Sequence, residues 1–199
     1  MGDEMNSGPL CPTTGEPYCH CDPETKTKIH LAARPRDTSR KLFTDHAVYT
    51  KFYINSYLDF SPDAEVVKPR LLSNQKEIGT FFGGYLGDKT GVAIATLFTD
   101  HIKAVSGFLI DTRDQKDTAH DLDAIRANIQ QVAKAFSSIT GSTLTADTVS
   151  EEFTRHNQFV IDMAIAHYNG DHNAEYQLYD QYYNHMLHFS DLLVSGLIH

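Results

Sequence analysis

Histidines stand at matching places in a repeated five-residue pattern, and imidazole is a common ligand of transition metals in proteins. The segment Leu42-Phe43-Thr44-Asp45-His46 recurs as Leu97-Phe98-Thr99-Asp100-His101. A weaker copy, Glu152-Phe153-Thr154-Arg155-His156, follows at the same interval. Repeats at a fixed interval are typical of chains built from several copies of one supersecondary unit. The pattern therefore predicts three related helical hairpins.

Each of these histidines lies on the apolar face of its segment when that segment is drawn as a helix. His101, for example, is three residues from Phe98 and four from Val105, which is the spacing of one helix face. Asn74 and Asn128 occupy apolar faces in the second and fourth segments, and His185 falls near the equivalent place in the sixth. Antiparallel helices of similar length bring their midpoints together, so we expect one polar layer across the core. This layer would consist of His46, Asn74, His101, Asn128, His156 and His185.

Buried polar groups cost about 1–3 kcal/mol each when they lack a hydrogen-bond partner, so something must satisfy this layer. A hydrogen-bonded layer that keeps the hairpins in register is the favoured interpretation. The alternative is a site for a metal ion or a small polar ligand. The metal ligands would be His46, His101, His156 and His185, and Gln75 joins the layer as a candidate ligand-binding residue. Zn or Fe would suit imidazole, although the Glu-x-x-His pairs of di-iron bundles are absent from this sequence.

The three cysteines gather near the N-terminus, at Cys11, Cys19 and Cys21, with His20 between the last two. Thiolates beside a histidine are zinc ligands, and His30 is a candidate fourth ligand. The usual Cys-x-x-Cys spacing is missing, so a tail with incidental thiols is the favoured interpretation. Such a tail would dock on a protein partner and become ordered there.

Prolines and apolar spacing divide the chain into a tail and a bundle. Residues 1–37 hold five of the seven prolines and lack helical periodicity, so they are expected to form an extended tail. Residues 38–199 show apolar residues at helical spacing and predict an all-α, up-and-down bundle. The expected helices run from about Thr38 to Asp59, Asp63 to Leu86, Lys89 to Ile110, Thr118 to Thr140, Thr145 to Tyr168, and Asp171 to the C-terminus. His167, His172 and His188 are expected to be solvated surface groups.

The formal net charge of −9 argues against nucleic acid or an anionic membrane as the main partner, since both require a basic surface. No apolar run approaches the roughly 20 residues of a membrane span. The N-terminus is too acidic and polar for a secretory signal, so a cytoplasmic or, for a viral protein, virion-associated location is expected. No phosphate-binding loop, dinucleotide fingerprint or nucleophile elbow occurs, and no catalytic residue is assigned.

Four ordered motifs resemble a poorly characterised family of helical proteins from bacteria and some large DNA viruses. The motifs are Asp45-His46 followed by Tyr49-Thr50-Lys51, Leu71-Leu72-x-Asn74-Gln75-x2-Ile78-Gly79, Asp100-His101-Ile102, and Tyr179-Asp180-x4-His185. Members of that family carry Trp-Thr-Arg where this chain has Tyr49-Thr50-Lys51. The resemblance covers roughly residues 40–198 and implies a helical fold with an important polar layer. It implies no reaction.

Three hypotheses follow, in order of preference. The first is a non-catalytic structural or interaction protein, a component of a larger assembly that contacts its partner through the N-terminal tail. The second is a binding protein for a metal ion or a small polar ligand held in the histidine–asparagine layer. The third is a metal-dependent hydrolase that uses the same layer.

Overall fold

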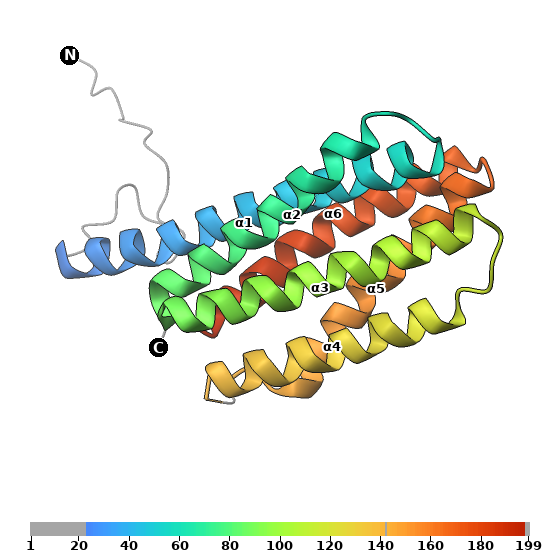
Figure 1. Cartoon of the computed structure of the whole chain (residues 1–199). Helices are drawn as coiled ribbons and strands as arrows, with labels where there is room; N and C mark the ends of the chain where they lie inside the picture. The colour runs from blue at the N-terminus through green and yellow to red at the C-terminus, as the bar shows by residue number, and fades with distance from the viewer. Residues whose placement is uncertain (1–22, 142, 198–199) are drawn as a thin grey trace, which may run out of the picture. The chain divides into compact units, whose positions relative to one another are not determined.

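A computed structural model describes residues 23–141 and 143–197, with side chains described from residue 34 onward. Within this part of the chain all regular structure is helical (Figure 1). The six helices are α1 Pro23–Leu58, α2 Ala64–Leu86, α3 Asp88–Arg113, α4 Ala119–Ile139, α5 Ala146–Tyr168 and α6 His172–Ser195. The prediction of an all-α bundle of about six helices is confirmed, while the threefold repeat of a hairpin stays a prediction.

Helix α1 begins earlier than the sequence suggested. It starts at Pro23 and continues through Pro35, whereas the expected tail extended to residue 37. The ring of Pro23 suits the first turn of a helix, where its missing N–H would have no partner in any case. By its contacts the chain divides into two units, Met1–Pro35 and Arg36–His199.

Turn and capping residues explain where the later helices begin and end. Gly87, with φ of 89°, separates α2 from α3 with a single residue in a conformation that favours glycine. The side chain of Thr145 accepts a hydrogen bond from the Thr148 amide at the start of α5. Asp171 caps α6 in the same way, by accepting from the Ala174 amide. These short connections make consecutive helices antiparallel neighbours.

The helices of the second unit pack on one another in chain order. Helix α2 packs on α3, α3 on α4, α4 on α5, and α5 on α6, and α3 also touches α5. Helix α1 meets α2 through a hydrogen bond from Asn74 to the carbonyl of Leu42. It meets α6 through the edge-to-face rings of Phe43 and Phe189. The six helices therefore enclose a single core.

Aromatic rings form the centre of this core. Phe43, Phe98 and Phe153, the phenylalanines of the repeated pattern, are all almost completely buried. The ring of Phe98 lies 6.4 Å from that of Phe43 and 6.1 Å from that of Phe153. Ring pairs at such distances are stabilised beyond the burial of their area. The three copies of the pattern thus meet at one level of the core, beside the histidines that follow them.

Helix α3 is long and strongly apolar. Among the helices of the described residues it alone has the length and composition to cross a membrane, with a mean hydropathy of 1.3 in its most apolar stretch. This is an exception to the expectation that no segment reaches that length. A core helix has the same properties, and the apolar face of α3, including Ile94 and Leu109, is buried against the neighbouring helices.

Candidate functional site

Three histidines from alternate helices meet in the core. The ring of His156 on α5 lies 5.5 Å from that of His46 on α1 and 5.3 Å from that of His101 on α3. The ring of His185 on α6 lies further out, 6.4 Å from His156. All four side chains are buried. The structure therefore brings together the histidines that the sequence placed at matching levels.

Gln75 fixes the protonation pattern of His46. Its amide nitrogen donates to His46 Nδ1 over 3.0 Å, which leaves the ring proton on Nε2. Nε2 then faces the hydroxyl of Thr50 at 3.4 Å. Both ring nitrogens of His46 are thereby engaged within the protein.

The sequence suggested that the two asparagines share a polar layer with the histidines, but both bind backbone carbonyl groups instead. Asn74 donates to the carbonyl of Leu42, and Asn128 donates to the carbonyl of Leu97, each over 3.0 Å. Leu42 and Leu97 open equivalent copies of the repeated pattern. Both asparagines use their amide groups to tie neighbouring helices together.

His185 on α6 lies beside Glu152 on α5. The backbone of Glu152, the residue that opens the third copy, opposes the lowering of the pKa of His185. Nδ1 of His185 lies 3.5 Å from a carboxylate oxygen of the same residue. His185 thus resembles Asn74 and Asn128 in position and borders the three inner histidines.

Two nitrogens of the inner histidines lack a protein partner. His156 donates from Nδ1 to the sulfur of Met186, which leaves its Nε2 as an unpaired acceptor. His101 Nδ1 is also buried and unpaired. Two cavities of about 10 Å³ each, measured as the space open to the centre of a water molecule, lie against His46, His101 and His156. Each suits about one water molecule, and no small organic ligand fits either of them.

Burial keeps the core histidines neutral. It lowers the pKa of His46 to about 4, although the side chain of Asn74 opposes the shift. Burial, aided by repulsion from His46, lowers the pKa of His101 to about 3. The pKa of His156 falls well below its ordinary value, mainly by burial, and that of His185 falls to about 4 for the same reason.

Donor atoms converge closely enough to hold a metal ion in two groups of the described residues. The core histidines form neither group, since their nitrogen atoms do not all lie within 4.8 Å of one another. Zinc bonds of about 2 Å require closer donors. The proposed tail ligands Cys11, Cys19 and Cys21 lie outside the described residues. The two groups are His167 with His172 and Glu175, and Asp111 with His120 and Asp121.

The first group lies at the turn between α5 and α6. The two oxygens of Glu175 accept from Nδ1 of His167 at 2.9 Å and from Nδ1 of His172 at 3.0 Å. Nε2 of His167 lies 3.0 Å from a carboxylate oxygen of Asp59. Lys51 is ion-paired with Glu175 and also donates to Asn55. His172 is exposed as expected, but His167 is buried because the end of α1 packs over the turn.

The second group joins the end of α3 to the start of α4. His120 Nε2 lies 3.5 Å from an oxygen of Asp111 and 3.4 Å from one of Asp121. Burial, together with the neighbouring Asp111, raises the pKa of Asp121, and one of its oxygens has no partner. Lys116 already neutralises Asp111 in part, at 3.9 Å.

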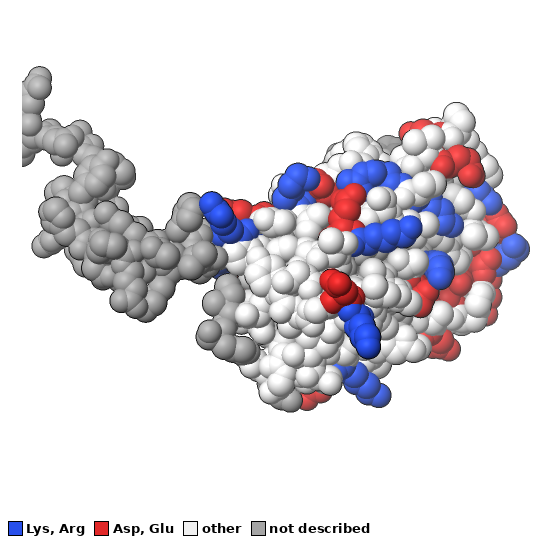
Figure 2. Space-filling model, turned by 60° about the vertical axis from the view of Figure 1, so that its left-hand side comes forward, with Lys and Arg blue, Asp and Glu red and all other residues white. Residues whose placement is uncertain are grey.

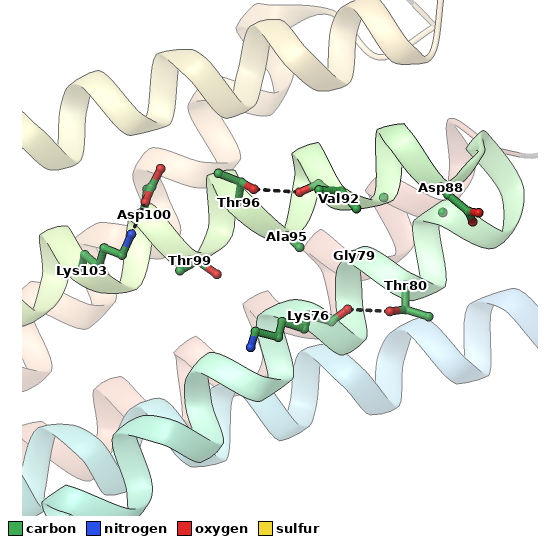
Figure 3. A pocket seen from close by; sticks show the side chains of 12 residues that line it. Lys76, Gly79, Thr80, Asp88, Val92, Ala95, Thr96, Thr99, Asp100 and Lys103 are labelled. Carbon is green, nitrogen blue, oxygen red and sulfur yellow. Dashed lines mark hydrogen bonds and ion pairs between the residues drawn. The ribbon is translucent and has the colours of Figure 1, made fainter.

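A groove of about 610 Å³ runs along the surface between α2 and α3 (Figure 3). Small residues bring the two helices into backbone contact beneath it. A Cβ atom on Gly79 would lie 2.5 Å from the carbonyl oxygen of Gly91 and 2.6 Å from Cβ of Ala95. The groove is shallow and open because Gly79, Gly91 and Ala95 carry so little side chain.

The two ends of the groove carry opposite charge. Lys76, Lys103 and Asp100 lie toward one end, and Asp88 lies at the other (Figure 3). Lys103 is paired with Asp100 at 2.7 Å, which leaves Lys76 as the excess charge at that end. Between the ends, Val92 is 67% exposed. On the face shown in Figure 2, acidic and basic side chains are interspersed among uncharged surface, without a continuous basic area.

The chain matches no family model, no curated protein and no solved structure.

Proposed function

We propose that the protein is a non-catalytic interaction protein that associates with a second copy of itself through the α2–α3 groove. The observation that carries this proposal is the groove itself, which combines small side chains, an exposed valine and oppositely charged ends. A twofold axis across its middle would place Asp88 of each copy on Lys76 of the other. Such an interface uses one patch twice and is self-complementary.

The dimensions of the groove suit a helical partner. It extends along α3 from Asp88 to Lys103, which corresponds to about 22 Å at 1.5 Å per residue. Small residues at a helix surface allow the backbone of another helix to approach closely. Val92, together with Thr80 and Thr96 on either side of the groove, would supply the central contacts.

The groove favours binding over catalysis. Its polar side chains are those of lysine, aspartate and threonine, without the histidine or cysteine of a paired nucleophile and base. The three inner histidines, His46, His101 and His156, line cavities of water-molecule size, whereas His185 borders an open surface pocket of about 310 Å³. We infer that the core layer keeps the helices in register, which agrees with the hydrogen bonds from Asn74 and Asn128 to neighbouring helices.

Charge exchange at the two ends tests this proposal. Asp88→Lys or Lys76→Asp alone would place like charges together in both halves of the dimer. Each is expected to weaken the dimer about tenfold, since two surface pairs are lost and each contributes up to about 1 kcal/mol. The double variant restores opposite charges and should regain wild-type affinity. Sedimentation equilibrium of the full chain measures all four dissociation constants.

Val92→Glu provides a stronger disruption at the centre of the groove, and Val66→Glu is its matched control. Val66 lies on α2, is 70% exposed and does not line the groove. Val92→Glu should give a monomer, and Val66→Glu should leave the dimer intact. A wild-type chain that stays monomeric, or a double charge variant as weak as the single ones, would contradict association through this groove.

A further inference from the structure

We propose that His167, His172 and Glu175 form a zinc site at the α5–α6 turn, and that Lys51 takes the place of the cation when zinc is absent. This inference is independent of the groove. It concerns a site formed by the last turn of one helix, the first turn of the next, and the end of α1.

The turn places three donors of suitable chemistry together. The chain reverses direction at Gly170, whose φ is 73°. His167 before the turn and His172 after it both contact the carboxylate of Glu175, and their ligand atoms all lie within 4.8 Å of one another. Zinc takes imidazole nitrogen and carboxylate oxygen at about 2.0–2.2 Å. Small side-chain rotations would bring these atoms to the roughly 3.4 Å separation that such bonds imply.

Asp59 supplies the second observation. Its carboxylate lies 3.0 Å from Nε2 of His167. Zinc at Nδ1 would displace the proton that this atom donates to Glu175, while Nε2 keeps its proton and donates it to Asp59. Metal-bound histidines commonly donate their other N–H to a carboxylate in this way, which orients the ring and strengthens the ligand.

The ammonium group of Lys51 stabilises the buried carboxylate of Glu175 when no metal is bound. Glu175 is fully buried, and a buried carboxylate requires a positive partner. Lys51 provides this partner from α1. Its ammonium also has other contacts available, to Asn55 at 2.9 Å and to the ring of Tyr176 at 4.7 Å. A metal ion bound to Glu175 would leave Lys51 with these two contacts, so the ion and the lysine compete for the same carboxylate.

The chemistry of the three donor side chains determines which metal ion the site would prefer. Two imidazoles and one carboxylate favour zinc over calcium or magnesium, which prefer all-oxygen sites. The side chain of His172 is 63% exposed, so the site is open to solvent on that side and a water molecule can complete the coordination. Cobalt is a suitable spectroscopic probe, because it accepts the same ligands and geometry.

Calorimetric titration with zinc tests the site in the full chain with Cys11, Cys19 and Cys21 replaced by serine and without a polyhistidine tag. One zinc ion per chain is expected. His172→Ala removes an exposed ligand and should weaken binding at least 100-fold without unfolding the protein. Lys51→Met removes the competing charge and should strengthen binding about tenfold. Cobalt absorption typical of tetrahedral coordination should appear in the parent and disappear in His172→Ala.

His120→Ala is the matched control, since His120 belongs to the other group of donors and is 72% exposed. It should bind zinc as the parent does. The absence of stoichiometric zinc binding, or equal affinity in the parent and His172→Ala, would overturn the site. If Lys51→Met folds and binds zinc no more tightly than the parent, the competition between lysine and metal is overturned. A loss of stability in Lys51→Met with no zinc bound by any variant would identify a purely structural ion-pair network.

Discussion

Acidification from pH 7 to pH 5 is expected to destabilise the bundle by about 8 kcal/mol, enough to unfold much of it. His46, His101, His156 and His185 are buried and carry folded-state pKa values far below the 6.5 of an exposed histidine. The unfolded chain therefore binds protons in this range that the folded chain cannot. Stability is complete above about pH 6.5 and is lost as the pH falls toward the folded-state values. Each histidine contributes about 2 kcal/mol of the loss.

This loss is large compared with the total free energy of unfolding of a domain, which is typically about 5–15 kcal/mol. Urea unfolding followed by far-ultraviolet circular dichroism at pH 7, 6 and 5 measures the free energy of unfolding. Its slope with pH should approach about 5 kcal/mol per pH unit, the value for four protons taken up on unfolding. Unchanged stability between pH 7 and pH 5 would show that these histidines are not held neutral in the folded state.

Two variants distinguish the contribution of the buried histidines to the pH dependence from that of an exposed histidine. His101→Leu replaces one buried imidazole by an apolar side chain of similar volume, so the slope should fall by one proton and unfolding should shift to lower pH. His188→Ala is the control, since its side chain is 64% exposed. It should leave the pH dependence as in the wild type. Glu152, which lies between His185 and His188, is intact in both variants.

Gly91→Val is expected to cost at least about 3 kcal/mol, because its added Cβ meets backbone atoms of another helix. That atom would lie 2.6 Å from the carbonyl oxygen of Gly79 and 2.7 Å from Cα of Gly83. Backbone cannot rotate away as a side chain can, so α2 and α3 would have to separate. The loss would appear as a lower urea midpoint at pH 7.

Gly84→Ala, a substitution in the same pair of helices, is expected to raise the stability. A Cβ atom at Gly84 would have no heavy atom within 4 Å. Alanine has a higher helix propensity than glycine, by about 1 kcal/mol. The variant should therefore be slightly more stable than the wild type. If Gly91→Val were as well tolerated as Gly84→Ala, the close contact between α2 and α3 would not exist.

The sequence predicted the helices well because helix formation depends on residues that are close together in the chain. Apolar residues at helical spacing marked six segments, and Gly87 and Gly170 marked turns between them. The main difference lies at α1, which continues through Pro35 to Pro23. Proline removes one hydrogen bond of the helix, and only the whole structure decides whether the helix continues past it.

The histidines show the limit of sequence reasoning about a site. Helical periodicity correctly placed His46, His101 and His156 on core faces, and their rings do meet. Periodicity says nothing about the rotation of each ring, and their nitrogens do not converge on a single point. Asn74 likewise lies in the core as expected, yet it binds a backbone carbonyl.

His167 and Glu175 could not have been found in this way. Their partner Lys51 is 124 residues from Glu175 in the chain, and none of the three forms part of a repeated pattern. A turn histidine is ordinarily solvated, and only the packing of α1 over this turn buries His167. The groove between α2 and α3 is similar, because it forms only where the small residues of two helices come into contact.

Helix formation and the choice of core-facing residues could both be predicted from the sequence, since both depend on residues three or four positions apart. Tertiary structure alone decided which polar atoms meet, because that depends on how distant helices cross and on the rotamers their packing allows. The repeated histidine pattern thus predicted the position of the polar layer. The close approach of Lys51, His167, His172 and Glu175 arose only when the first helix packed against the last two.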